Sequence, residues 1–402
     1  MRRVLLLVPV LCAAAACLAA GTKLEEKASA EPAPQADPKL AKRLAPFKAA
    51  LRSADPEERQ AAYRAFLDAG DDGRRLLRET LLPLRSQLVE RCGAFALSAE
   101  AQKRLRKAHE MMSAARAEAL RVIFDRNIYP DANHGRSGQP VVDKAVDAVK
   151  TLYKPYKALY GPVMRRLLTV LRMHARIAEF DTQLELCSVE GVELRPSLET
   201  LVPKVPADLL AILAERAKFW DYCFRCERYN QRVKTSMSSA ERRVVELTNE
   251  YRIQLGIKPL AINEPLTQAA RKHSAEMAAM GYFGHSSPKP ERRSPGQRCA
   301  LEGYRHFRGE NCASGAGAVG AFRMWYHSSG HHRNMISPGS NEIGVGFAGP
   351  WTEDFGGRPD LDLDRPPRSW GGETAQPEPA EPKPKRKPKK KTPFPWDEFF
   401  RH

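Results

Sequence analysis

Three histidines stand close together in the segment YHSSGHHRNMI, which runs from Tyr326 to Ile336. His327 and His331 are four residues apart, the spacing that places two zinc ligands on one face of a helix in HExxH metalloproteases. Ser328 occupies the position of the glutamate base, however, and the Ser-Ser-Gly segment interrupts such a helix. The sequence therefore disfavours a metalloprotease of this type.

Two upstream segments supply potential ligands for a different kind of metal site. FGHSSP contains His285, and GEN contains Glu310. Two imidazoles and one carboxylate suit a zinc ion that keeps an open position for water. We expect His285, Glu310 and His331 to converge in one cleft, where they bind a ligand or a metal, and His327 and His332 to lie outside it. Because a further acidic ligand is lacking, zinc is expected to bind weakly.

Cysteine usage favours an oxidising compartment. The chain has eight cysteines, and two of them, at positions 12 and 17, belong to an N-terminal leader. Cys223 and Cys226 form a lone CxxC without the second CxxC of a zinc ribbon or the βαβ context of a thioredoxin-like motif. We expect structural disulfides, with Cys299 and Cys312 near enough in sequence to bridge a loop.

The elements that must position the histidines begin at Ser238. Ser238 and Glu241 form a capping box that opens a helix, and Gly256 ends it. Asn263 caps the next helix, whose apolar stripe includes His273, so we predict that His273 is a hydrogen-bonded core residue.

A third helix is predicted near residues 316–326, and two strands follow it. The segment EIGVGF alternates apolar residues with glycine, as a strand does, and WTEDFG is a candidate final strand. Helices and short antiparallel strands in this order predict an α+β layered domain.

Six segments of residues 240–356 resemble, in their order and spacing, the bacterial branch of the CAP superfamily of cysteine-rich secretory proteins, venom allergens and plant pathogenesis-related proteins. The segments are LTNEYRIQLGIKPLAINEPLTQAARKHSAEM, FGHSSP, GEN, MWYHSSGHHRNMI, EIGVGF and WTEDFG. The resemblance implies an α-β-α sandwich with a cleft lined by two histidines and two acidic residues. His285, Glu310 and His331 match three of these positions, and Ser328 stands at the fourth.

Family members divide between the binding of ligands, including sterols and other lipids, and reported proteolysis. The resemblance also covers Trp325, Asn311 and Asn334, for which it implies packing and loop hydrogen bonds.

Residues from about 40 to 235 show a helical pattern without a catalytic motif. Asp55 and Pro56 open a helix that resembles one HEAT-like unit, but no second copy follows. A longer helical segment is predicted to break near Pro155 and Pro162. The polar segment YPDANHGRSGQP is predicted to be a solvated turn.

The two ends of the chain indicate export. Arg2 and Arg3 precede an apolar run and small residues, as in a secretory signal peptide, whereas lipid attachment at Cys17 is a weaker alternative. The tail is rich in proline and carries a cationic block at 383–391. The predicted organisation is a signal peptide at 1–20, a linker at 21–39, a helical domain at 40–235, a CAP domain at 236–356 and a disordered basic tail at 357–402.

The charge balance favours anionic partners. The chain has 65 Lys and Arg against 48 Asp and Glu, a formal net charge of +17. Export argues against nucleic acid and leaves a cell-envelope polyanion, with a peripheral membrane contact through the tail. The charge says nothing about the oligomeric state.

Three functions are open to such a sequence. Because no serine or cysteine is arranged with a base as a nucleophile, no catalytic residue is predicted. We therefore favour an exported, non-enzymatic binding protein of the cell envelope, whose cleft holds a small lipid-like ligand or a divalent metal. The alternatives are a metal-dependent hydrolase acting on peptide or cell-wall material, and a structural envelope protein with a vestigial cleft.

Overall fold

The computed structural model of the protein describes residues 37–131, 138–315, 317–367 and 370. The predicted signal peptide, the cationic block and positions 133 and 134 of the polar turn lie outside these residues. The chain divides into two compact units, which are residues up to Ser86 with Glu179–Leu194, and Gln87–Ala178 with the residues from Arg195 onward. This division runs through two helices and does not fall at residue 235, and the predicted boundary there stays a prediction.

The smaller unit is helical. It contains α1 (Pro38–Ala50), α2 (Pro56–Leu67), the first part of α3 (Gly70–Gly93) and the last turns of α5 (Gln139–Glu185). Asp55 caps α2 by accepting a hydrogen bond from the Glu57 backbone, as predicted. A buried ion pair between Arg85 and Asp181, 2.5 Å long, joins α3 to the end of α5.

The larger unit begins with the end of α3. It continues with α4 (Ala99–Phe124), most of α5, α6 (Leu198–Leu201) and α7 (Ala207–Arg232). The predicted breaks at Pro155 and Pro162 are wrong, because α5 runs unbroken through both prolines. Both prolines lie on an exposed face, and so do Thr151 and Ala158, the residues four positions earlier. Water can therefore satisfy the carbonyls that each proline deprives of a partner.

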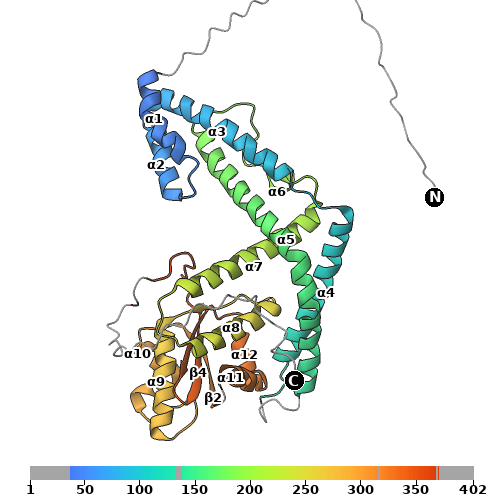
Figure 1. The fold of residues 1–402 in the computed structure, drawn as a ribbon, viewed down its shortest axis with the longest axis vertical. Helices are drawn as coiled ribbons and strands as arrows, with labels where there is room; N and C mark the ends of the chain where they lie inside the picture. The colour runs from blue at the N-terminus through green and yellow to red at the C-terminus, as the bar shows by residue number, and fades with distance from the viewer. Residues whose placement is uncertain (1–36, 132–137, 316, 368–369, 371–402) are drawn as a thin grey trace, which may run out of the picture. The chain divides into compact units, whose positions relative to one another are not determined.

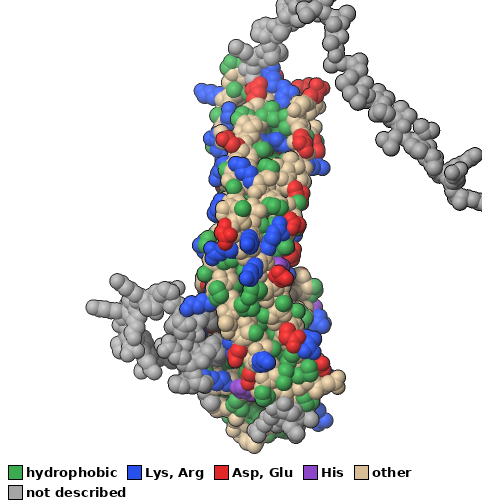
Figure 2. All heavy atoms as spheres, turned by 90° about the vertical axis from the view of Figure 1, so that its right-hand side faces the viewer, with side chains coloured by type: hydrophobic (Ala, Val, Ile, Leu, Met, Phe, Trp, Pro, Cys, Tyr) green, Lys and Arg blue, Asp and Glu red, His purple; other side chains and the backbone are tan. Residues whose placement is uncertain are grey.

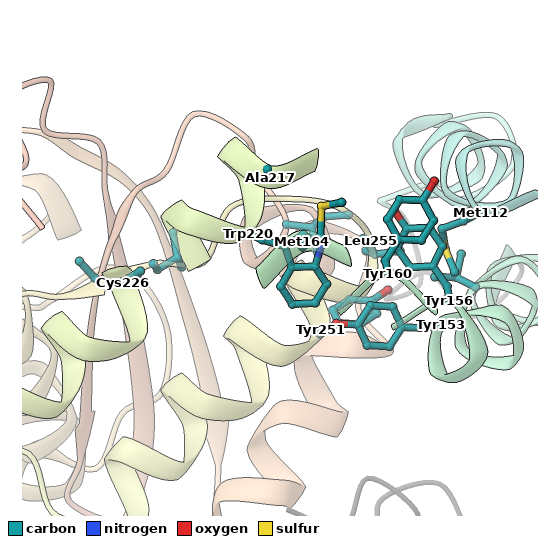
Figure 3. Close-up of a cluster of buried hydrophobic side chains, with 14 of the residues drawn as sticks. Met112, Tyr153, Tyr156, Tyr160, Met164, Ala217, Trp220, Cys226, Tyr251 and Leu255 are labelled. Carbon is teal, nitrogen blue, oxygen red and sulfur yellow. The ribbon is translucent and has the colours of Figure 1, made fainter. Parts of the chain in front are cut away.

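An aromatic core joins these helices to the next one, α8 (Ser239–Gln254) (Figure 3). Tyr153, Tyr156 and Tyr160 of α5 are buried in it, and Tyr156 and Tyr160 stack with their ring centroids 4.3 Å apart. Tyr251 of α8 belongs to the same continuous hydrophobic cluster. In the larger unit, the helical residues and the residues after 235 thus share one core.

The C-terminal part of this unit has a four-stranded sheet with the order β1-β3-β4-β2. The strands are β1 (Ala261–Ile262), β2 (Phe307–Ser314), β3 (Glu342–Phe347) and β4 (Pro350–Gly356). β1 pairs with β3 in parallel, and the other two pairs are antiparallel. The predicted strands EIGVGF and WTEDFG are therefore confirmed as β3 and β4, whereas β2 was not predicted.

Helices cover both faces of the sheet, which gives the α-β-α sandwich (Figure 1). α9 (Glu264–Met280) packs on one face, and Gly344 and Gly346 leave no room there, because a Cβ atom at either would meet the α9 backbone at 2.2 Å. The opposite side is covered by α8, α11 (Gly317–Tyr326) and α12 (Ser329–Met335). The α+β fold class and the preceding helical region are thus as predicted.

The helix ends follow the sequence signals closely. Ser238 and Glu241 form the predicted capping box of α8, and Asn263 caps α9. Gly281 ends α9 in the left-handed conformation, with φ of 68°. A short 3-10 helix (Pro290–Arg292) and α10 (Pro295–Leu301) then lead into β2.

The fold continues past the predicted boundary at residue 356. Leu363 is buried, and the Trp370 indole donates a hydrogen bond to the Lys234 carbonyl. Apolar side chains in an otherwise polar segment account for this packing. Among the described helices, none combines the length and apolar character needed to cross a membrane.

Candidate functional site

His285, Glu310 and His331 come together at one edge of the sandwich. His285 follows the left-handed end of α9, Glu310 lies on β2, and His331 lies on α12. The Nδ1 atom of His285 is 2.9 Å from Oε1 of Glu310, and the ring centroids of His285 and His331 are 5.8 Å apart. We call these three residues the histidine site; their role as ligands stays a prediction.

Glu310 is buried between His285 and an arginine that the sequence did not single out. Arg298 of α10 has a completely buried side chain and donates a 2.5 Å hydrogen bond to Oε2 of Glu310. Burial alone would raise the pKa of Glu310, but the hydrogen bond from His285 and the charge of Arg298 outweigh it and hold the pKa below its usual value. Glu310 is therefore an anion in the folded protein.

The state of Glu310 decides the tautomer of His285. A carboxylate only accepts hydrogen bonds, so Nδ1 of His285 carries the proton that it donates to Glu310. Nε2 then keeps a lone pair, and half of the His285 side chain is exposed to solvent. A carboxylate that orients an imidazole in this way is the usual partner of a metal-binding histidine. Glu310 thus acts through His285, and both of its oxygens already have partners.

The loop that carries His285 is fixed from two sides. Arg298 donates hydrogen bonds to the carbonyls of His285 and Arg292 at 3.0 Å. Glu276 of α9 accepts hydrogen bonds from Tyr282, Ser287 and Arg292. These contacts hold the exposed His285 on a rigid segment.

Two asparagines tie β2 to the helix of His331. Asn334 donates to the Glu310 carbonyl at 3.2 Å and to the side chain of Asn311 at 3.0 Å. Asn311 in turn donates to the His331 carbonyl at 3.1 Å. This is the loop hydrogen bonding that the family resemblance implies for both asparagines.

The two neighbouring histidines lie elsewhere. His332 is completely buried, and its Nε2 is 2.8 Å from the Tyr251 hydroxyl on α8. His327 is exposed and contacts the Tyr326 ring edge-on, with centroids 5.0 Å apart. Ser328 begins the turn before α12 and makes no side-chain capping bond.

Residues of the helical region contact α12 through hydrogen bonds and an ion pair. Arg333 donates to the carbonyls of Ile123 and Tyr129 and pairs with Asp131. The Ser329 hydroxyl donates to the Pro130 carbonyl at 2.9 Å. The polar turn after α4 was predicted to be solvated, but its first residues contact α12, because Arg333 and Ser329 supply donors for its carbonyls. No local sequence signal announces this contact.

The cysteines require a correction. All six cysteines in the described part of the chain are buried free thiols, so the predicted disulfides are not formed. Cys223 and Cys226 lie within the continuous helix α7 and pack in the core. Cys312 lies 3.6 Å from Glu310, and burial and the negative charge of Glu310 raise the pKa of its thiol. A thiol held in this state is a poor nucleophile.

His273 is the buried, hydrogen-bonded core residue that was predicted, with Nε2 2.9 Å from the Gly284 carbonyl. The sequence did not reveal that His273 lies beside Glu310 and Cys312, with one possible ligand atom of each within 4.8 Å of the others. Asp354 of β4, directly opposite Glu310 in the sheet, was also missed. The only available signal was the shared face of Glu310 and Cys312, two residues apart on one strand.

Comparisons with known proteins identify the family of this fold. The family model of the cysteine-rich secretory protein family, CAP, matches residues 245–355. The chain is 37% identical over 221 residues to the uncharacterized protein YkwD of Bacillus subtilis (strain 168), a match that covers 53% of this chain and 81% of YkwD. It is 29% identical over 120 residues to the uncharacterized membrane protein YlbC of the same organism, covering 29% of this chain and 34% of YlbC.

Two solved structures show a partial likeness. One is an extracellular protein containing a SCP domain from Bacillus anthracis str. Ames, at 28% identity and a TM-score of 0.28, covering 30% of this chain and 40% of that one. The other is an outer surface protein from Borrelia burgdorferi, at 18% identity and a TM-score of 0.27, covering 31% of this chain and 99% of that one. Taken with the match to YkwD and the α-β-α sandwich, the family model shows that this chain belongs to the cysteine-rich secretory protein (CAP) family.

Proposed function

We propose that the protein is an exported, non-enzymatic binding protein of the cell envelope, and that its histidine site holds a small ligand or a divalent metal. The observation that carries the proposal is the hydrogen bond from His285 Nδ1 to the buried anion Glu310. It leaves Nε2 of a half-exposed imidazole available beside the ring of His331. This nitrogen, together with the neighbouring ring of His331, can bind a metal ion weakly, and it can accept a hydrogen bond from a ligand.

Apolar surface beside His285 supports a lipid-like ligand. Phe283, two residues before His285, is 56% exposed, and Met280 at the end of α9 is 48% exposed. These two side chains offer apolar surface close in sequence to His285, which a lipid-like ligand could contact.

The two alternatives have less support. A metal-dependent hydrolase needs a general base beside the metal-bound water. The pKa of Glu310 is held below its usual value, which makes it a weak base, and Ser328 is not an acid. A vestigial cleft would not need the network that Arg298, Glu276 and Asn334 maintain around the histidines.

The partner of the tail is a separate proposal. On the face drawn in Figure 2, acidic and basic side chains lie interspersed. The densest run of positive charge in the sequence is the block at 383–391, outside the described residues. We assign to this block a salt-sensitive contact with anionic envelope polymers or anionic lipid.

Calorimetric titration of zinc into the full chain tests the histidine site. His331→Ala should weaken the zinc affinity at least about tenfold, since it removes one of the two imidazoles of the histidine site, a half-buried one. The matched control is His327→Ala, which removes an exposed imidazole four residues away and should leave the affinity unchanged. Zinc binding should also be lost as the pH falls, because a protonated imidazole cannot ligate. Equal affinities for both variants and the wild type would mean that the site does not bind metal.

A further inference from the structure

A second group of possible ligands lies buried beneath the histidine site. Of the described residues, His273 of α9, Glu310 and Cys312 of β2 each place one ligand atom within 4.8 Å of the other two. All three are buried, with exposed fractions of 0%, 5% and 5%. We call them the buried donor cluster. It shares only Glu310 with the histidine site, so the inference does not rest on the proposed function.

Asp354 adds a second buried carboxyl group to this region. It faces Glu310 across the β2–β4 ladder and has no exposed surface. Neither of its oxygens has a partner at good hydrogen-bond geometry, but the Glu310 carboxyl group and the Cys299 thiol lie close enough to interact with it. Two carboxyl groups buried side by side are costly to ionise together, and a cation beside them would relieve that cost.

His273 is prepared to act as a ligand. Its Nε2 lies 2.9 Å from the Gly284 carbonyl, which can only accept, so Nε2 carries the proton. Nδ1 therefore keeps a lone pair. The Tyr282 hydroxyl lies 3.4 Å from this nitrogen and donates its own proton to Glu276 at 2.7 Å. Metal-binding histidines commonly donate their other ring N–H to a backbone carbonyl in this way.

The spacing and chemistry of the donors suit a tetrahedral ion. Sγ of Cys312 is 3.6 Å from Oε1 of Glu310. Ligands at bond lengths of about 2.0–2.3 Å around a tetrahedral centre lie about 3.3–3.7 Å apart. One imidazole, one thiolate and one carboxylate are a donor set that zinc and cobalt(II) prefer over calcium or magnesium.

The charges in the cluster also balance. Arg298 contributes one positive charge next to Glu310, and a divalent ion contributes two. Glu310, the Cys312 thiolate and the Asp354 carboxylate would together contribute three negative charges. Other polar groups that face the cluster are the His285 ring, 3.8 Å from Cys312, the Thr352 hydroxyl beside Cys312, the Tyr282 hydroxyl beside His273, and the neutral Cys299 thiol.

We propose that His273, Glu310 and Cys312 bind one divalent transition-metal ion of the zinc type, with the Asp354 carboxylate as its neighbouring counter-charge. On binding, the Cys312 thiol loses its proton to solvent and forms a sulfur–metal bond, and Asp354 ionises. This ion lies in the interior of the domain, unlike an ion at the exposed Nε2 of His285. Because His273 lies on α9 and the other two ligands lie on β2, the ion would crosslink these two elements.

Cobalt(II) titration of the reduced, metal-free full chain tests the site, followed by electronic absorption. A thiolate ligand gives a sulfur-to-cobalt charge-transfer band, which imidazole and carboxylate ligands do not produce. We expect this band at one cobalt per chain, and its loss when zinc is added. Cys312→Ser should abolish the band, and His273→Gln should weaken cobalt binding by at least about tenfold.

Matched variants separate this site from the other candidates. Cys299→Ser and Cys223→Ser remove other buried thiols and should leave the band intact, as should His331→Ala in the histidine site. Asp354→Asn keeps the shape but removes the counter-charge, and should weaken binding by about 10–100-fold. Circular dichroism establishes that each variant is folded.

The proposal is overturned if the folded wild-type chain binds cobalt without the charge-transfer band, or not at all. It is also overturned if the band survives in Cys312→Ser, or depends on Cys223 or Cys299 instead. Because the wild-type spectrum alone can decide against the site, the test does not depend on any variant being stable. Loss of one of two zinc-binding events in His331→Ala, with the cobalt band intact, would support both sites separately.

Discussion

At the scale of single residues, two adjacent histidines differ in how deeply they are buried and in what they contact. His331 and His332 are adjacent, yet His331 lies near the exposed ring of His285 and His332 is completely buried against Tyr251. Burial lowers the pKa of His332 to about 3, and the charge of Arg333 adds to the effect. His332 therefore stays neutral in the folded protein.

This difference predicts a pH dependence of stability. In the unfolded chain His332 takes up a proton near its ordinary pKa of about 6.5, whereas in the folded protein it does not until about pH 3. The unfolded state thus binds more protons in this window, and its contribution lowers the free energy of unfolding as the pH falls from 6.5 towards 3. In His332→Gln, urea unfolding should depend less on pH between 7 and 5 than in the wild type.

His327→Gln is the matched control, because it removes an exposed histidine from the same segment. It should leave the pH dependence as it is in the wild type. A His332→Gln protein that lost stability on acidification as steeply as the wild type would assign the effect to other groups.

At the scale of elements, local signals decide where the helices of the sandwich begin and end. The α8 capping box is an example, in which the Ser238 hydroxyl accepts from the Glu241 backbone and the Glu241 carboxylate accepts from the Ser238 backbone at 2.6 Å. The same carboxylate pairs with Arg271 of α9 and accepts from the Phe347 backbone of β3. The cap thus joins the helix start to both neighbouring layers.

We predict that Ser238→Ala lowers the free energy of unfolding by about 0.5–2 kcal/mol, because the first turn of α8 loses its side-chain acceptor. Ser239→Ala is the control, since Ser239 is exposed and lies inside the helix, where alanine is favourable. Urea denaturation of both variants would measure the difference. A loss of equal size at both positions would show that the cap contributes nothing particular.

At the scale of the whole molecule, the main core of the larger unit is continuous across residue 235. Tyr251 and Leu255 at the end of α8 are buried in the same cluster as the tyrosines of α5. Arg116 of α4 also donates a hydrogen bond to the Gln254 carbonyl at 2.8 Å. The helical region thus supplies part of the packing surface of the CAP sandwich.

A chain limited to residues 236–356 should therefore fold cooperatively but with a lower free energy of unfolding than one spanning 87–370. Each large apolar side chain that is exposed again costs about 1.5–3 kcal/mol, and Tyr251 and Leu255 are two of them. Urea denaturation of both fragments would measure the loss. Equal stabilities would mean that the sandwich does not need the helical residues.

The sequence by itself determined the features that depend on neighbours along the chain. The capping box of α8, the Asn263 cap of α9 and the alternation in β3 each involve residues a few positions apart, so they could be predicted correctly. The family followed from six segments in order, and His285, Glu310 and His331 were named from the same motifs. The continuous helix through Pro155 and Pro162 was missed, because the exposure of its carbonyls depends on what packs against the helix.

Only the tertiary structure decided which partner each of these side chains has. Arg298, His273 and Asp354 reach Glu310 from different elements, and no spacing in the sequence links them. The cysteines stayed free because thiols near in sequence are directed by helix and strand geometry into the core rather than toward each other. Charges, tautomers and pKa values are set by such long-range neighbours, since electrostatic surroundings are a property of the folded interior.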